Sequence, residues 1–378
     1  MKPNMVGRFV RLGLVSIVAL GLVGAQVIAH AQDTLCFGLQ SADCQLLSAG
    51  TKASILTLKS FYLDYDINFK VTGTPDGDSA LTVHGTGPFD ANGADLTGLN
   101  PAGGSQVLGK VTGLLGKIIL GTTVDAATTT KGKTTNLHVE LRVLNNMLYI
   151  NETKLTQGKW KFRDLKMLAW MVAGMAGAGQ LPGAVATQPA AAPSSADIMA
   201  QMQSLMKIDG LITAERGPDV TVGSDKIAAF IFHVDLQKLY SSPDLVAMIK
   251  TAQAKQPADK QKTDDEIKAT ITKLATANKD LKLSFTRFVG ADDKLSHGFS
   301  LDLTGPADLS GLKDLAPASA TSNSIAAAAL SGPVGLDIHF KVLLSAIGQK
   351  ANLTAPADAL PFNFSGPRTP AGTAPAAS

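Results

Sequence analysis

Hydrophobic and polar residues alternate along several stretches of the chain, which is the pattern of a β-strand with one buried side and one solvent-facing side. In the clearest stretch, from Leu63 to Val71, apolar side chains occupy every second position, and Asp, Asn or Lys stand between them. The residues Thr74-Pro-Asp-Gly-Asp78 then favour a tight turn, and the strand pattern returns at 79–85. These residues predict a β-hairpin.

The same alternation recurs farther along the chain, at spacings typical of further hairpins. We expect additional strands at 137–143, 147–151, 159–163, 227–235, 281–289, 295–303, 336–344 and 346–353. Together they make about ten to twelve strands, which favours one large antiparallel sheet over βαβ units. Because strands on both sides of residues 174–195 follow the same pattern, we expect one sheet from both halves; two separate domains are the alternative.

Helical periodicity appears between the strands. We expect helices that begin at 41–43 and that cover 164–175, 195–207, 235–250 with a break at Pro243, and 264–278. The fold class is therefore α+β. Residues 174–195 are rich in Gly, Ala and Pro, and we interpret them as a flexible insertion.

The first 31 residues have the features of a secretory signal. Lys2, Arg8 and Arg11 precede an apolar run, and Ala29-His30-Ala31 offers small residues at a cleavage site after Ala31. An uncleaved membrane anchor is the alternative, because the apolar run is nearly long enough to span a bilayer. These three cations account for the whole net charge of +3, so the predicted mature chain is neutral. We expect a secreted or periplasmic protein.

Cys36 and Cys44 are the two cysteines of the chain. An exported protein meets an oxidising compartment, so we predict a disulfide between them. The loop that it closes is short, so the expected stabilisation is about 2–3 kcal/mol. Their spacing matches neither a Cys-x-x-Cys pair nor a zinc site with a histidine pair, which makes a redox or metal role the less favoured alternative.

Recognisable catalytic motifs are missing from the sequence. No Gly-x-Ser-x-Gly elbow and no His-Glu-x-x-His pair occurs. The histidines after residue 31 all fall in predicted strands: His84, His138, His233, His297 and His339. We therefore expect no enzyme, no cofactor and no metal site. Aromatic residues make up 5% of the chain, which with the neutral charge argues against nucleic-acid binding. The Lys-rich residues 250–262 are either a solvated loop or a transient membrane contact.

Short motifs in three parts of the chain suggest a family. A helix leads into the strand 60–70, Met147-Leu-Tyr-Ile-Asn151 is followed by Gly158-Lys-Trp160, and Asp292-Asp-Lys-Leu295 joins two strands before a closing strand and Asn352-Leu-Thr-Ala-Pro356. This combination resembles the LppX/LprAFG-type lipoproteins and, more distantly, the LolA-like fold. The resemblance covers most of residues 40–356, and the Gly-Lys-Trp motif is its most specific part.

The resemblance implies an open half-barrel, in which a large antiparallel sheet curls around helices and a hydrophobic cavity. It also implies a carrier that binds acylated lipids outside the cytoplasm. The sequence departs from the family in lacking the lipid-attachment cysteine. We expect a signal peptide at 1–31, a lipid-binding domain at 32–362 with the insertion near 174–195, and a disordered tail at 363–378.

The function expected from these observations is a non-enzymatic exported carrier of lipids or lipoprotein acyl chains, with a lipid or acylated ligand as its partner. Deformable Met side chains beside the insertion suit an adaptable lid, although ordinary core packing would also explain them. The expected residues of the cavity and lid are Met167, Trp170, Met171, Met175, Met199, Met202, Met206, Tyr65 and Phe69. The alternative function is a structural or protein-interaction module of the cell envelope, with a filled core and no lipid.

Overall fold

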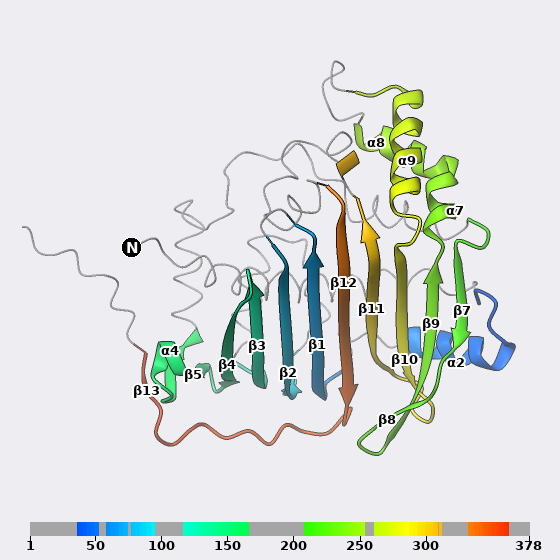
Figure 1. The fold of residues 1–378 in the computed structure, drawn as a ribbon. Helices are drawn as coiled ribbons and strands as arrows, with labels where there is room; N and C mark the ends of the chain where they lie inside the picture. Colours follow the sequence, from blue (N-terminus) through cyan, green and yellow to red (C-terminus); the bar gives the residue numbers. More distant parts are fainter. Residues whose placement is uncertain are drawn as a thin grey trace, which may run out of the picture.

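One large β-sheet forms the body of the molecule (Figure 1). The computed structural model describes residues 36–52, 58–74, 77–94, 116–165, 208–253, 261–308, 310–311 and 332–362. Within these residues the sheet has thirteen strands. The predicted α+β class with a large curled sheet is therefore confirmed.

The strands fall into an N-terminal and a C-terminal set along the chain. The first set is β1 (Ser60–Thr72), β2 (Ser79–Asp90), β3 (Ile119–Thr130), β4 (Lys133–Leu144), β5 (Met147–Glu152) and β6 (Lys161–Asp164). The second set is β7 (Ile212–Arg216), β8 (Val220–Val222), β9 (Asp225–Val234), β10 (Lys282–Gly290), β11 (Ser296–Ala307), β12 (Val334–Ser345) and β13 (Leu360–Pro361).

The two sets meet where β1 pairs with β12. The strand order is β13-β6-β5-β4-β3-β2-β1-β12-β11-β10-β9-β7, and β8 pairs with β9 beside this path. Neighbouring strands are antiparallel, apart from the short parallel pair of β13 and β6. Strands from both halves of the chain therefore form one continuous sheet.

Five helices lie among the described residues: α2 (Ser41–Lys52), α4 (Thr153–Thr156), α7 (Leu236–Ser241), α8 (Pro243–Gln253) and α9 (Asp264–Ala277). The helices α7, α8 and α9 gather at one end of the C-terminal strands (Figure 1). The predicted break at Pro243 is confirmed, because α7 ends before this residue and α8 begins with it. Among the residues described, no helix is long and apolar enough to cross a membrane.

Local capping explains where two of these helices begin. The Asp235 carboxylate accepts hydrogen bonds from the backbone N–H groups of Gln237 and Lys238 at the start of α7. Thr263 and Glu266 form a reciprocal capping box at the start of α9. Both arrangements satisfy N–H groups that the first turn of a helix leaves without partners.

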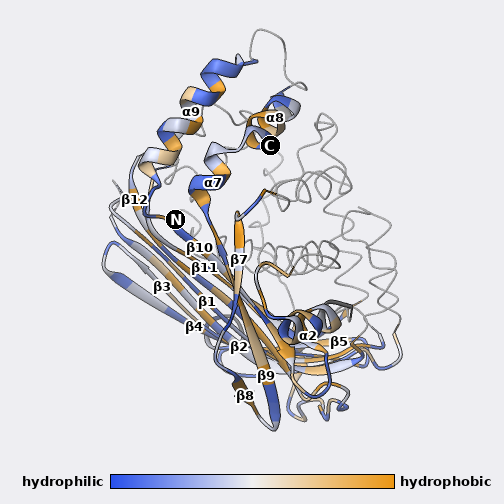
Figure 2. Cartoon of the chain, turned by 90° about the vertical axis from the view of Figure 1, so that its right-hand side faces the viewer, coloured by the Kyte–Doolittle hydropathy of each residue, from blue (hydrophilic) through white to orange (hydrophobic). Residues whose placement is uncertain are grey.

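The sheet curls around the side that carries α2, as seen in Figure 2. Leu47 of α2 packs against Ala228, Phe230 and Phe232 of β9 and against Val289 of β10, and all five residues are buried. The helix therefore covers the apolar face of β9 and β10. We call the surface of the sheet on this side the concave face.

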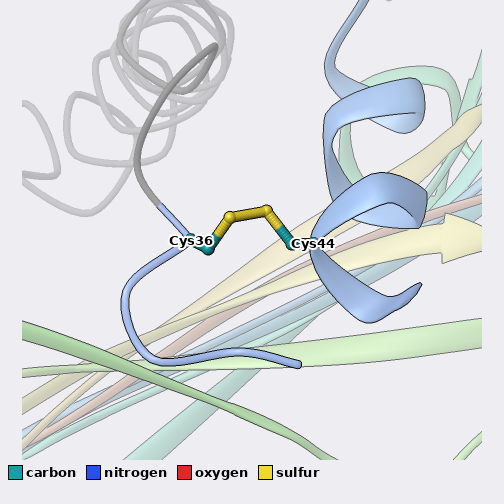
Figure 3. Close-up of a disulfide and its surroundings, with 2 residues drawn as sticks. All are labelled: Cys36 and Cys44. Carbon is teal, nitrogen blue, oxygen red and sulfur yellow. A yellow bond between two sulfur atoms is a disulfide. The ribbon is translucent and has the colours of Figure 1, made fainter. Parts of the chain in front are cut away.

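The predicted disulfide between Cys36 and Cys44 is present (Figure 3). Their Cα atoms are 5.3 Å apart, within the usual range for a disulfide. The bond ties the first turn of α2 to the segment before it. In that segment the Phe37 carbonyl accepts a hydrogen bond from the Ala214 N–H of β7, at 2.8 Å.

Most predicted strands are confirmed, but the strand predicted at 346–353 is wrong. Ala346 and Gly348 have φ angles of 50° and 84°, so the chain turns as soon as β12 ends. Sequence alternation also missed β3, whose run of Gly, Ala and Thr residues gives little contrast between its two faces, and the short strands β7 and β8. The helices predicted at 164–175 and 195–207 lie outside the described residues, apart from Asp164, which ends β6, and Leu165.

The packing of α2 gives a first prediction. We expect Leu47→Ala to lower the free energy of unfolding by about 2–4 kcal/mol, because the truncated side chain leaves a cavity against Phe230 and Phe232. Urea unfolding measures this change. Gln45→Ala, at an exposed position of the same helix, is the control and should change the stability by less than about 0.5 kcal/mol. Equal effects of the two substitutions would contradict the packing.

Candidate functional site

The concave face is apolar across nine strands. Residues directly opposite one another in neighbouring strands lie on the same face of a sheet, so the register groups them into rows. The middle row is Ala214, Phe232, Phe285, Leu301, Phe340, Ile67, Val83, Ala126 and Leu137. No member of this row is polar, which makes it a continuous hydrophobic path across the sheet.

Aromatic rings strengthen the C-terminal half of this face. Phe232 stacks on Phe285 with ring centroids 4.4 Å apart, and Phe299 packs against Phe340 at 5.4 Å. Offset and tilted ring pairs at these distances stabilise a protein by more than the burial of their apolar area alone. The rings therefore add two aromatic pairs to the apolar face, one across β9 and β10 and one across β11 and β12.

Exposure differs sharply along the middle row. Phe232, below α2, is completely buried, whereas Leu301, two strands away, has 38% of its surface exposed. Ile67 and Phe340 are partly exposed as well. Large apolar side chains at the centre of the sheet thus keep surface that another apolar group could cover.

Two residues predicted to contact a ligand, Tyr65 and Phe69, lie on this face of β1. Tyr65 packs over Gly85 of β2, where a Cβ would stand 2.2 Å from the Tyr65 Cζ atom. Burial raises the pKa of Tyr65, so its hydroxyl group is neutral at physiological pH. Phe69 joins an apolar cluster with Val71 and Leu336 near one end of the sheet.

The other predicted residues of the site lie outside the described part of the chain. These are Met167, Trp170, Met171, Met175, Met199, Met202 and Met206. Their role in a lid stays a prediction.

Arg287 lies on the concave face and was not predicted from the sequence. In β10 the positions that face inward are Leu283, Phe285, Arg287 and Val289, so a charged residue stands where the alternation calls for an apolar one. This break in the pattern is the signal that could have identified it. Arg287 is 7% exposed.

Much of the opposite face of the sheet is polar and carries alternating charges, whereas at β9, β10 and β12 it holds an apolar cluster of Ile227, Ala229, Phe288 and Leu343. One row in register consists of Lys341, Asp66, His84, Asp125 and His138, from β12 to β4. His84 lies 2.7 Å from Asp66, and His138 lies 2.6 Å from Asp125. Cross-strand pairs of opposite charge stabilise neighbouring strands modestly when solvent surrounds them.

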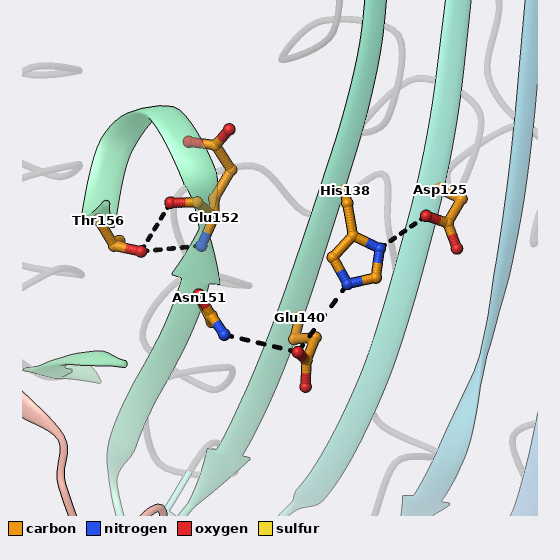
Figure 4. Close-up of polar contacts among 6 residues, drawn as sticks. All are labelled: Asp125, His138, Glu140, Asn151, Glu152 and Thr156. Atoms are coloured by element: carbon orange, nitrogen blue, oxygen red, sulfur yellow. Dashed lines mark hydrogen bonds and ion pairs between the residues drawn. The ribbon is translucent and has the colours of Figure 1, made fainter. Parts of the chain in front are cut away.

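Figure 4 shows how His138 lies between two carboxylates. Its Nδ1 atom contacts Asp125, and its Nε2 atom lies 3.9 Å from Glu140 on the same strand. The hydrogen bond to Asp125, the largest effect, raises the pKa of His138. On β12, His339 likewise contacts Asp302 and Asp337, and the bond to Asp302 is the main cause of its raised pKa.

Three ligand-type side chains of the polar face converge. Asp64, Asp66 and His84 each place a donor atom within 4.8 Å of the other two. Carboxylate and imidazole groups in this number are compatible with a divalent cation. The hydrogen bond between His84 and Asp66 also accounts for their position without one.

Two small cavities open on the polar face. One of about 340 Å³ lies beside α7 and is lined by His233, Ser284 and Asp302, among others. The other, of about 150 Å³, lies where Leu353 of the C-terminal segment crosses β2 to β4. In the first cavity the His233 Nε2 atom lies 3.2 Å from Glu215. His233, Ser284 and Asp302 of the first cavity belong to the polar face, and Leu283, which faces inward, also contributes to its lining.

Comparison with known proteins finds likeness in structure alone. No family model matches the sequence, and no curated protein matches it. The crystal structure of LprF from Mycobacterium bovis is similar, with a TM-score of 0.28 and 10% identity, over 82% of this chain and 95% of that chain. The crystal structure of the Mycobacterium tuberculosis lipoprotein LppX is also similar, with a TM-score of 0.24 and 10% identity, over 82% of this chain and 100% of that chain.

LprF and LppX are both names from the group that the sequence resembles. The fold class itself rests on the strand order and register described above.

The polar face predicts a pH dependence of stability. Because the folded protein raises the pKa of His339, the stabilisation is complete below the ordinary imidazole pKa of about 6.5 and is lost as the pH rises through the folded value. We expect the loss of unfolding free energy in His339→Gln to be larger near about pH 5.5 than near about pH 8.5. Urea unfolding at both pH values measures it. The exposed control Asn136→Gln should show no such difference between the two pH values. A His339→Gln effect that grows with pH would contradict the raised pKa of His339 in the folded protein.

Proposed function

We propose that the protein is a non-enzymatic, exported carrier of acylated lipids, and that it binds acyl chains on the concave face. The observation that carries the proposal is the continuous apolar row across nine strands, together with the exposed surface that its central members keep. A sheet that had only a structural role would cover such residues with its own helices. Burying apolar surface is the main driving force for binding an acyl chain.

The arrangement of the face favours a flexible ligand. Its central residues are aliphatic and phenylalanine side chains without hydrogen-bonding groups, so they impose no fixed orientation on a partner. Adjacent strands are about 4.8 Å apart, so the nine strands of the row span roughly 38 Å before curvature is taken into account. This length accommodates an extended acyl chain.

We assign Tyr65 and Phe69 to the surface that contacts the acyl chain. The residues Met167, Trp170, Met171, Met175, Met199, Met202 and Met206 are proposed as a deformable cover over it. We further propose that residues 1–31 direct export and are removed after Ala31. A carrier of this kind acts by binding and release and needs no cofactor.

Two variants, each with a new carboxylate on a different face of the sheet, test the proposal. We expect Leu301→Glu to reduce the lipid recovered with the purified protein at least about tenfold, because a carboxylate at the centre of the concave face would have to lose its water when a chain binds. Native mass spectrometry followed by lipid extraction measures the bound lipid. Leu301 is already 38% exposed, so the variant should fold.

The matched control is Ser300→Glu, at the neighbouring position on the polar face of β11. This variant should carry as much lipid as the unmodified protein. Equal loss in both variants, or a protein that binds no amphiphile at all, would refute the carrier function and favour an interaction module of the cell envelope.

A further inference from the structure

Arg287 is a buried charge in the middle of an apolar surface. On its own strand it stands between Phe285 and Val289, and its neighbours across the sheet are Phe230 of β9 and Phe299 of β11. With 7% of its surface exposed, the guanidinium group has lost most of its water. A buried cation is costly unless an anion or several hydrogen-bond acceptors surround it.

The structure supplies little compensation for this charge. One nitrogen, Nη2, donates to the Gly50 carbonyl of α2 at 3.5 Å, which is the outer limit of a hydrogen bond. The Nε atom is buried and has no hydrogen-bond partner in the part of the chain that the structure describes. Within the same residues no Asp or Glu forms an ion pair with Arg287. A guanidinium group has five N–H donors, so most of them have no acceptor among the described residues.

Arg216 of β7 shows what a compensated arginine looks like in the same row. It lies next to Phe230 in register, as Arg287 does on the other side. Arg216 forms ion pairs with Asp43, at 3.4 Å, and with Asp219. Of the two arginines that flank Phe230, Arg287 is therefore the one without an anion among the residues that the structure describes.

Arg287 is still charged at neutral pH. Burial lowers its pKa to about 10, which leaves the guanidinium protonated under physiological conditions. The site therefore offers a permanent positive charge with planar donors, which match the oxygens of a carboxylate or phosphate in two parallel hydrogen bonds.

We propose that Arg287 binds the anionic oxygen headgroup, a carboxylate or phosphate, of the amphiphile held on the concave face. This inference rests on the proposed carrier function and gives the apolar binding surface one charged end. The row that contains Arg287 continues through Phe299, Val342 and Tyr65, which are partly exposed and apolar along their length. The headgroup is fixed at Arg287, and the acyl chain extends from it toward β1.

The alternative role of Arg287 is to hold the C-terminal end of α2, whose carbonyl groups attract a positive charge. The two roles predict different consequences when the charge is removed. If Arg287 binds a headgroup, the ligand-free protein keeps or gains stability in Arg287→Met, because an apolar side chain replaces an unpaired buried charge. If Arg287 caps α2, the same substitution lowers the stability of the protein.

The test compares palmitic acid with hexadecanol, which has the same chain length and no charge. Displacement of a fluorescent fatty amphiphile from the purified, delipidated protein gives both affinities. We expect the unmodified protein to bind the acid at least about tenfold more tightly than the alcohol, because only the acid pairs with Arg287. In Arg287→Met this preference disappears while the alcohol binds as before, and the thermal midpoint without ligand is unchanged or higher.

Lys341→Met is the matched control, since it removes one positive charge from the polar face of β12. It should keep the preference for the acid.

Inorganic phosphate is tested alone, and a lipid headgroup site predicts weak binding of it. The inference is overturned if Arg287→Met keeps the preference, if its thermal midpoint falls by several degrees, or if free phosphate binds as tightly as palmitic acid. Hexadecanol binding in every variant would still support the carrier function, whereas no binding of either amphiphile would refute it.

Discussion

The antiparallel pairing of β1 with β12 is the contact that makes one molecule of two sets of strands. It runs from Tyr62 to Thr72 on one strand and from Gly335 to Ser345 on the other, although more than half of the chain separates them in sequence. The entropic cost of closing such a long loop grows only slowly with its length, so many paired residues offset it. Without this pairing the apolar rows would stop in the middle of the molecule.

Alternation along each strand then gives the sheet two chemically different faces. The concave face is apolar and receives α2, whereas the opposite face carries cross-strand pairs such as His84 with Asp66. Because α2 covers β9 and β10 and leaves Leu301 of β11 partly exposed, the same helix completes a core and ends where the proposed binding surface begins. The buried core and the proposed binding surface thus share one face of the sheet and occupy different strands of it.

Much of this architecture follows from local sequence patterns. Period-two alternation places Tyr65 and Phe69 on the apolar face of β1, and Pro243 separates α7 from α8. The strand β3 escapes such an analysis, because its Gly, Ala and Thr residues gain their two faces only from the strands on either side.

The site was harder to predict than the fold. The charge row of the polar face depends on register, which turns and pairing fix together and which no single strand encodes. Arg287 breaks a visible pattern, but that no carboxylate of the described residues pairs with it depends on where α2 and the distant carboxylates lie. Properties that depend on several elements at once therefore became visible only in the three-dimensional arrangement.

Both outer edges of the open sheet receive cover from near the ends of the described chain. Beside β7, the Phe37 carbonyl accepts the Ala214 N–H, and at the other edge β13 runs along β6, with Leu360 bonded to the Trp160 carbonyl at 3.0 Å. Unpaired strand edges are templates on which further copies of a chain can add strands and aggregate. A closed barrel removes its edges, at the cost of enclosing its interior. Here short terminal segments protect the edges, so the sheet stays open on its apolar side without inviting self-association through its backbone.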